Sequence, residues 1–241
     1  GTTGKPKGNM VTHRNILRTV KQSNYLTIHH EDTVMSLSNY VFDAFMFDVF
    51  GALLNGAKLI VLPKDQILNM NELSGAIEKE KVSILMITTA LFHLLIDMKK
   101  GSLKNVRKVL FGGERASVPH VVAALETVRE DKLIHMYGPS ESTIFTTYYP
   151  VNHIEEQALS IPIGKPVSQT AVYIVDEFGH VQPPGVAGEL CVAGDGLVKG
   201  YYHQPELTSE KFVENPFRPG EVMYKTGDLA RWLSNGDIEF I

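Results

Sequence analysis

Cysteine is nearly absent from the sequence, which has one thiol, Cys191, in 241 residues. A single thiol excludes an internal disulfide framework and a metal site built from several cysteines. Dense runs of lysine and arginine are also missing, and the net charge is -4, so the sequence lacks the electrostatic footprint of a protein that binds nucleic acid or an anionic membrane. No apolar run approaches the roughly 18 residues of a membrane-spanning helix. These absences favour a cytoplasmic protein whose partner is a small molecule.

The composition is that of a folded protein. Hydrophobic residues make up 44% of the chain and charged residues 21%, which disfavours disorder, and 241 residues are enough for one or two domains.

Over the first 155 residues, short apolar runs of strand length alternate with segments of helical periodicity. The expected strands are 34–37, 58–62, 83–87, 106–111 and 133–136, and the expected helices are 12–26, 42–54, 71–80, 89–98 and 118–130. Thr12 is the expected N-cap of the first helix. This alternation predicts a parallel sheet with helices on both faces, in which ligands bind beyond the carboxyl ends of the strands.

The pattern changes after about residue 155. Alternating apolar stretches such as 172–175 and 189–192 are separated by turns rich in glycine and proline, which predicts a smaller antiparallel β-barrel-like subdomain. A short helix is expected at 206–213, capped by Thr208 or Ser209. We therefore expect two subdomains, 1–155 and 156–241.

The first eight residues, Gly1-Thr2-Thr3-Gly4-Lys5-Pro6-Lys7-Gly8, have the composition of a loop that binds phosphate. Glycines allow the backbone to approach a ligand, hydroxyls donate hydrogen bonds and lysines bring positive charge. The loop is not of the Walker type, because a glycine follows the last lysine where that pattern has serine or threonine. The same residue types also form ordinary surface turns, so the phosphate-binding interpretation needs support from further motifs in the sequence.

Two further polar stretches support the phosphate-binding interpretation. The first, Tyr137-Gly138-Pro139-Ser140-Glu141-Ser142-Thr143, directly follows an expected buried strand. An aromatic ring there can stack on a base, and a carboxylate can hold magnesium. The second, Tyr224-Lys225-Thr226-Gly227-Asp228, places a carboxylate in a turn, where it can accept hydrogen bonds from two vicinal hydroxyls.

These motifs, in this order and at this spacing, resemble those of the adenylate-forming (AMP-binding) enzyme superfamily. It includes acyl-CoA ligases, luciferases and the adenylation domains of nonribosomal peptide synthetases. Ser140 stands where the family motif has threonine. The stretch 188–201 resembles a structural motif of the family, so we assign it to folding rather than catalysis. The resemblance implies the N-terminal core of this fold, with the β-rich subdomain closing an ATP site, and ATP and Mg²⁺ as cofactors.

The resemblance also implies roles for individual residues. It places Thr2, Thr3 and Lys7 near the β and γ phosphates and Glu141 on Mg²⁺, as the catalytic set. Asp228 would bind the ribose hydroxyls. The full set of implied nucleotide-binding residues is Gly1, Gly4, Gly113, Glu114, Tyr137, Gly138, Ser140, Asp228 and Phe240.

Asp43 separates the branches of the superfamily. By resemblance, an aspartate at this place binds the α-ammonium of an amino acid, whereas ligases of fatty or aryl acids have no ammonium to match. Removing one partner of a buried ion pair costs roughly 3–5 kcal/mol, so a carboxylate in this apolar stretch argues for a cationic substrate group. The alternative is that Asp43 merely caps the following helix.

The family's substrate pocket can be matched residue by residue. Apart from Asp43, no matched residue has a polar side chain, and burying an unpaired polar group would cost roughly 1–3 kcal/mol. We therefore expect an apolar substrate side chain. The pattern resembles members that activate leucine, with Gly112 leaving room for a branched chain and with valine and isoleucine as competitors. Plain core packing is the alternative for each position. The matched residues are Asp43, Ala44, Phe47, Met86, Leu110, Gly112, Met136, Ile144 and Phe145.

The reaction implied is attack of an amino acid carboxylate on ATP, followed by transfer to phosphopantetheine on a carrier domain. Peptidyl carrier and condensation domains of a parent synthetase would be the partners. The chain begins within the loop motif and ends before the family's C-terminal domain, so we expect a fragment that lacks that domain's catalytic lysine and is impaired alone. Two alternatives stay open, an acyl-CoA ligase-type fragment and a non-catalytic binding module on the same fold.

Overall fold

The chain folds into two packed β-sheets, and a computed structural model describes residues 7–21, 23–155 and 157–241 of it. The first sheet has seven strands in the order β2-β1-β3-β4-β5-β6-β7. Strands β1 to β5 pair in parallel, whereas β6 and β7 form antiparallel pairs at one edge. The strands are β1 Thr33–Ser36, β2 Lys58–Val61, β3 Ile84–Thr88, β4 Lys108–Gly112, β5 Leu133–Tyr137, β6 Thr147–Val151 and β7 Lys165–Pro166.

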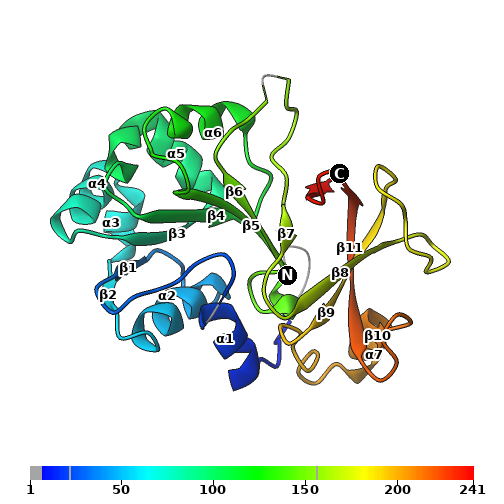
Figure 1. Cartoon of the computed structure of the whole chain (residues 1–241). Helices are drawn as coiled ribbons and strands as arrows, with labels where there is room; N and C mark the ends of the chain where they lie inside the picture. Colours follow the sequence, from blue (N-terminus) through cyan, green and yellow to red (C-terminus); the bar gives the residue numbers. More distant parts are fainter. Residues whose placement is uncertain (1–6, 22, 156) are drawn as a thin grey trace.

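Helices cover both faces of this sheet (Figure 1). On one face lie α1 (His13–Val20) and α2 (Ala44–Leu53). On the other lie α3 (Lys64–Leu68), α4 (Met70–Lys79), α5 (Thr89–Lys99) and α6 (Val118–Leu125). Each face has its own buried apolar cluster, which is why the central strands are buried along nearly their whole length. The predicted fold class is confirmed.

The predicted ends of two helices are wrong. Helix α1 does begin after Thr12, whose hydroxyl accepts the Asn15 N–H at 3.2 Å while its own N–H donates to Asn15 Oδ1 at 2.7 Å. It ends at Val20 rather than at 26, because the chain becomes extended at Lys21 and then buries Tyr25. Helix α6 likewise ends at residue 125 rather than 130. Helix α3 was not predicted, since five residues are too few to show a helical period.

The second sheet is antiparallel throughout and confirms the predicted change of architecture. Its order is β10-β11-β9-β8, with β12 also paired to β11. The predicted division at 155/156 falls between β6 and β7, both of which pair with the first sheet. The elements are β8 Thr170–Val175, β9 Gly188–Gly194, α7 Pro205–Lys211, β10 Phe212–Glu214, β11 Val222–Trp232 and β12 Ile238–Phe240.

Helix α7 begins one residue before its predicted start. The predicted capping by Thr208 or Ser209 is wrong. The N-cap is Gln204, and Thr208 lies inside the helix. The Thr208 hydroxyl donates to the Gln204 carbonyl at 2.8 Å and accepts the Tyr201 N–H at 2.9 Å. The Ser209 hydroxyl donates to the Glu206 carbonyl. Thr208 thus ties the helix to the preceding turn instead of capping its first turn.

The segment after the N-terminal loop lies along the second sheet's side of the molecule. The Met10 N–H donates to the Gly200 carbonyl at 3.0 Å, and the Tyr202 N–H donates to the Gly8 carbonyl at 2.7 Å. At the other end of the seam, near the C-terminus, the Ile163 N–H donates to the Ile238 carbonyl at 2.8 Å. Backbone hydrogen bonds therefore fix the two sheets to each other at both ends of the seam between them.

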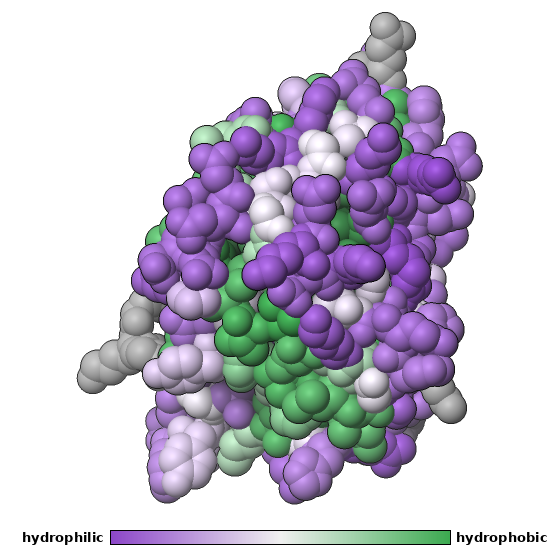
Figure 2. Space-filling view, turned by 90° about the vertical axis from the view of Figure 1, so that its left-hand side faces the viewer, coloured by the Kyte–Doolittle hydropathy of each residue, from purple (hydrophilic) through white to green (hydrophobic). Residues whose placement is uncertain are grey.

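One side of the first layer is apolar. In the described part of the chain β2 pairs only with β1, so it forms an edge of the sheet. Val61 on β2 and Leu68 at the end of α3 are 66% and 65% exposed. Figure 2 shows apolar surface on this side of the molecule, where β2, α3 and α4 lie. Among the described residues, none of the helices is both long and apolar enough to cross a membrane.

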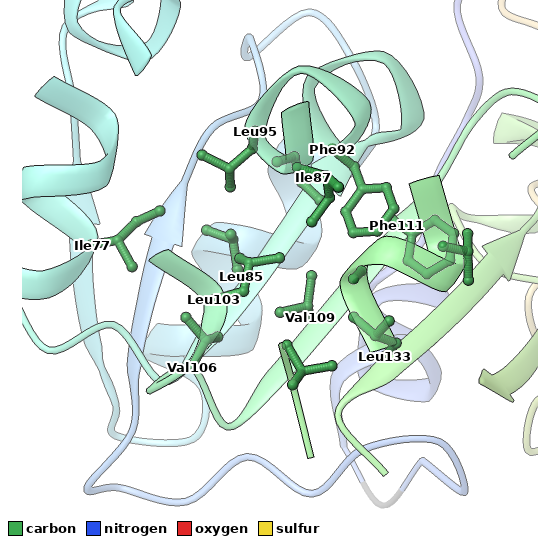
Figure 3. Close-up of a cluster of buried hydrophobic side chains, with 14 of the residues drawn as sticks. Ile77, Leu85, Ile87, Phe92, Leu95, Leu103, Val106, Val109, Phe111 and Leu133 are labelled. Carbon is green, nitrogen blue, oxygen red and sulfur yellow. The ribbon is translucent and has the colours of Figure 1, made fainter. Parts of the chain in front are cut away.

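The larger core cluster lies between the sheet and helices α4, α5 and α6 (Figure 3). Phe92 on α5 stacks on Phe111 of β4 with ring centroids 4.5 Å apart and an interplanar angle of 10°. Phe111 stacks in turn on His135 of β5 at 5.1 Å. This stack supports the ends of β4 and β5.

We predict that Phe92→Ala lowers the free energy of unfolding by about 3–5 kcal/mol, because it leaves a cavity beside Phe111. Leu94→Ala, on the same helix at a residue that is 41% exposed, is the control. It should cost less than about 1 kcal/mol. Urea denaturation monitored by circular dichroism measures both, and equal losses would contradict this description of the core.

Candidate functional site

A pocket of about 360 Å³ lies where β4 and β5 end and the second sheet begins. Six residues predicted to bind nucleotide line it, and they come from segments more than 100 residues apart in the chain. Two more of its lining residues, His135 and Met136, belong to β5. The six are Gly113, Glu114, Tyr137, Gly138, Asp228 and Phe240. The fold thus gathers these residues into one concave site at the carboxyl ends of parallel strands.

Tyr137 and Asp228 link the two sheets inside this pocket. The Tyr137 hydroxyl donates to Asp228 Oδ2 at 2.5 Å. Burial, together with the nearby charge of Asp228, raises the pKa of Tyr137 well above its usual range, so the hydroxyl stays protonated as a donor. The Asp228 N–H donates to Thr226 Oγ1 at 3.0 Å, which fixes the turn that carries the carboxylate. The Phe240 ring lies 6.1 Å from the Tyr137 ring, so two aromatic surfaces flank the pocket.

Glycine is required at two positions of this site. Gly113 has a φ of +96°, which side chains other than glycine rarely adopt. A Cβ on Gly138 would lie 2.3 Å from the Ile144 carbonyl oxygen. Gly113 thus allows a sharp turn directly after β4, and Gly138 allows the close approach of the backbone at Ile144.

A second group of predicted residues lies around Tyr201. The Tyr201 hydroxyl donates to Glu141 Oε1 at 2.7 Å, and Lys7 Nζ lies 5.2 Å from the centre of the Tyr201 ring. Ser140 begins the short 3₁₀ turn Ser140–Ser142 that carries Glu141. The structure therefore brings Lys7 and Glu141 to one tyrosine. Gly1, Thr2, Thr3 and Gly4 lie outside the described residues.

Sequence reasoning missed the contact of Tyr201 with this group. The stretch 188–201 was assigned to folding, and most of it is the buried strand β9 and the turn after it. Its last residue is nevertheless a side-chain partner of Glu141. The available signal in the sequence was Gly200, directly before Tyr201. Gly200 has a φ of +127°, and Tyr201 after it is buried.

No group of three or more histidine, cysteine, aspartate or glutamate residues that could hold a metal ion occurs in the described part of the chain. The described residues therefore do not form a metal site in which all ligands come from the protein. Glu141 offers a single carboxylate. One carboxylate is the usual protein share when Mg²⁺ is bound mainly by phosphates and water.

The predicted substrate pocket residues lie together on the α1 and α2 face of the first sheet. Phe47 and Phe145 meet edge to face with ring centroids 5.3 Å apart. Ala44 is partly buried against the cluster that the other apolar members form. These members are Phe47, Met86, Leu110, Met136, Ile144 and Phe145, each at most 6% exposed. Their proximity fits a pocket wall and also fits core packing, so their role stays a prediction.

Gly112 and Asp43 border this cluster. A Cβ on Gly112 would lie 2.1 Å from the Met136 carbonyl oxygen, so the close approach of β5 explains the glycine without reference to a ligand. Asp43 occupies the N-cap position of α2 but makes no side-chain capping hydrogen bond. The helix-cap alternative for Asp43 therefore lacks its expected interaction.

Asp48, one turn further along α2, was not predicted and is fully buried. Its Oδ2 accepts the Ser36 hydroxyl at 3.2 Å, while its Oδ1 has no partner among the described residues. Burial raises the pKa of Asp48 to about 8, against the hydrogen bond from Ser36, which favours the charged form. The signal in the sequence was a single charged residue inside the apolar helix 44–53.

The chain is similar to known proteins along its whole length. A family model described as "AMP-binding enzyme" matches residues 1–202. Surfactin synthase subunit 1 of Bacillus subtilis (strain 168) is 69% identical over 100% of this chain and 7% of that protein. Bacitracin synthase 1 of Bacillus licheniformis is 55% identical over 100% of this chain and 5% of that protein.

A solved structure extends the comparison to the fold. It is holo-PA1221, described as an NRPS protein containing adenylation and PCP domains bound to a vinylsulfonamide inhibitor. It matches with a TM-score of 0.91 at 35% identity, over 100% of this chain and 42% of that one. The chain thus spans less than half of the length of each of these three proteins.

Asp48 should make the stability of the chain depend on pH. Because the pKa of Asp48 is raised in the folded state, its carboxyl keeps its proton there between about pH 4 and 8 but loses it on unfolding. The free energy of unfolding therefore falls as pH rises through this window. The slope is at most about 1.4 kcal/mol per pH unit. We predict that Asp48→Asn flattens the slope and stabilises the protein at pH 8, measured by denaturation at several pH values.

Asp65→Asn, at an exposed aspartate of α3, is the matched control and should leave the slope unchanged. An unchanged slope in Asp48→Asn would show that Asp48 is charged in the folded protein.

Proposed function

The chain belongs to the AMP-binding enzyme family, as its motifs predict, and we propose that it forms the N-terminal core of an amino-acid-activating adenylation domain of a nonribosomal peptide synthetase. The complete domain is an ATP-dependent ligase that converts ATP and an amino acid into an aminoacyl-adenylate and pyrophosphate. The observation that carries this proposal is the convergence of Tyr137, Asp228 and Phe240 on one pocket at the carboxyl ends of β4 and β5.

The nucleotide is assigned to this pocket on chemical grounds. Adenine is flat and apolar on its faces, which suits the space between Gly113 and the rings of Tyr137 and Phe240. The Asp228 carboxylate can accept hydrogen bonds from both ribose hydroxyls, because two oxygens and their lone pairs match two vicinal donors. Tyr137 fixes its orientation through the 2.5 Å bond to Oδ2.

The phosphates are assigned to the side where Lys7 and Glu141 lie. Lys7 supplies positive charge for the β and γ phosphates. The Tyr201 hydroxyl donates to Glu141 Oε1 and so orients the Glu141 carboxylate, which would hold Mg²⁺. When bound, Mg²⁺ neutralises charge on the phosphates. Catalysis in this proposal is positioning and charge stabilisation, without a side-chain nucleophile.

The substrate is assigned from Asp43 and the apolar cluster. Asp43 binds the α-ammonium, and the absence of a capping bond to α2 supports this role. The apolar residues around Phe47 and Phe145 favour an aliphatic side chain, because a polar one would lose its hydrogen bonds there. We propose leucine, with valine and isoleucine as weaker substrates.

In the reaction, an oxygen of the amino acid carboxylate attacks the α-phosphorus of ATP. A new bond to phosphorus forms, the bond to the bridging oxygen breaks, and pyrophosphate leaves. The acyl group then passes to the phosphopantetheine thiol of a carrier domain, and AMP is released. The adenylation and PCP domains of the NRPS protein that matches this chain support a carrier partner. A condensation domain is the further partner that a synthetase requires.

The proposed function is tested by amino-acid-dependent ATP–pyrophosphate exchange, in the complete adenylation domain that contains this chain, across the twenty amino acids. Leucine should give the highest rate, and valine, one methylene smaller, should be lower by about tenfold or more in kcat/KM. Exchange with fatty or aryl acids but with no amino acid would favour the acyl-CoA ligase alternative. Failure to form any adenylate would favour a non-catalytic module.

Asp43→Ala should raise the KM for leucine at least about 100-fold, because the ammonium loses its charged partner, and leave the KM for ATP nearly unchanged. Asp65→Ala, at an exposed aspartate of α3, serves as the control. Undiminished leucine activation by Asp43→Ala would remove Asp43 from the site.

A further inference from the structure

Arg18 on α1 is a buried guanidinium whose two shorter hydrogen bonds go to backbone carbonyls, and a longer one goes to the Ser142 hydroxyl. Arg18 is 4% exposed. Its Nη1 donates to the Phe145 carbonyl at 2.7 Å, and its Nη2 donates to the Ser142 carbonyl at 2.9 Å. Burial lowers the pKa of Arg18 to about 10, so it remains charged at neutral pH. A buried charge that spans two carbonyls holds those carbonyls at a fixed separation.

The turn between these two carbonyls is in an unfavourable backbone conformation. Thr143 and Ile144 have φ values of +50° and +73°. Both residues are β-branched, and such residues rarely adopt positive φ unless their surroundings hold them there. Thr19, next to Arg18 on α1, donates from its hydroxyl to the Thr143 carbonyl at 3.2 Å. Arg18 and Thr19 therefore bind three carbonyls in and around this turn.

The opposite side of the guanidinium faces the second sheet. A Cβ on Gly196 would lie 1.4 Å from Arg18 Nη2, so only glycine leaves room for the guanidinium. The Thr143 hydroxyl donates to the Gly196 carbonyl at 2.7 Å, and Asn15 Nδ2 donates to the Asp195 carbonyl at 2.7 Å. The turn is thus clamped between α1 and the residues that follow β9.

Ile144 and Phe145, which this turn carries, are two residues of the predicted substrate pocket, and Phe145 packs on Phe47. Glu141 has separate supports, since Tyr201 binds its carboxylate and the Val198 N–H donates to its carbonyl at 2.9 Å. Loss of the clamp should therefore move the pocket wall more than the phosphate side.

We propose that Arg18 is a positioning residue that holds Ile144 and Phe145 in place and thereby sets the selectivity for the amino acid side chain. The inference rests on the proposed function, because it needs an amino acid substrate in this pocket. Arg18 touches neither substrate, and it acts through the backbone of the turn.

The test uses the complete adenylation domain and the variant Arg18→Lys, which keeps the charge but cannot span both carbonyls. The KM for leucine should rise about tenfold and the ratio of kcat/KM for leucine over valine should fall about fivefold, as expected when a bond to a charged group is lost. The KM for ATP should change by less than about twofold. Thr19→Val, which removes the hydroxyl that contacts the Thr143 carbonyl at 3.2 Å and the Asn15 carbonyl at 3.0 Å, should act in the same direction with a smaller effect.

Arg14→Lys, one turn earlier on the exposed side of α1, is the matched control and should change none of these values. If Arg18→Lys does not fold, as judged by its melting curve, the Thr19→Val result decides. An equal rise in both KM values, or an unchanged leucine to valine ratio in a folded variant, would overturn the inference. Absence of leucine-dependent exchange in the unmodified domain would instead overturn the proposed function.

Discussion

The hydrogen bond from Tyr137 to Asp228 joins the end of β5 to β11 and so fixes the two sheets to each other at the pocket. Burial keeps the tyrosine hydroxyl protonated, so the contact has one possible donor and a charged acceptor. Without it, the aspartate would not be held against the aromatic wall. The position of the second sheet relative to the first is therefore part of the site, and the pocket exists because two architectures meet.

Polar contacts of the same kind recur along the seam between the sheets. Tyr201 bonds to Glu141, and Arg18 lies between the turn after β5 and the residues that follow β9. Buried polar groups need partners, and those of Tyr137 and Glu141 come from the other side of the seam. The residues that position the predicted ligands are thus also those that hold the two layers together, which couples stability to function in this region.

Periodicity predicted the alternation of strands and helices, the parallel order of the central sheet and the switch to antiparallel structure, because burial on one or both faces leaves a clear pattern. It misplaced the end of α1, since the apolar residues after Val20 pack as an extended segment. Motif resemblance predicted six of the residues that line the pocket as nucleotide-binding residues. It missed Tyr201, Asp48 and Arg18, whose importance depends on contacts between segments far apart in the chain.

A structure of the complete adenylation domain bound to a non-hydrolysable leucyl-adenylate analogue tests the central claim most directly. We predict adenine in the space between Gly113 and the rings of Tyr137 and Phe240, both ribose hydroxyls on Asp228, and the leucine side chain against Phe145. A nucleotide bound elsewhere, with the pocket between the two sheets still filled by solvent, would contradict this account.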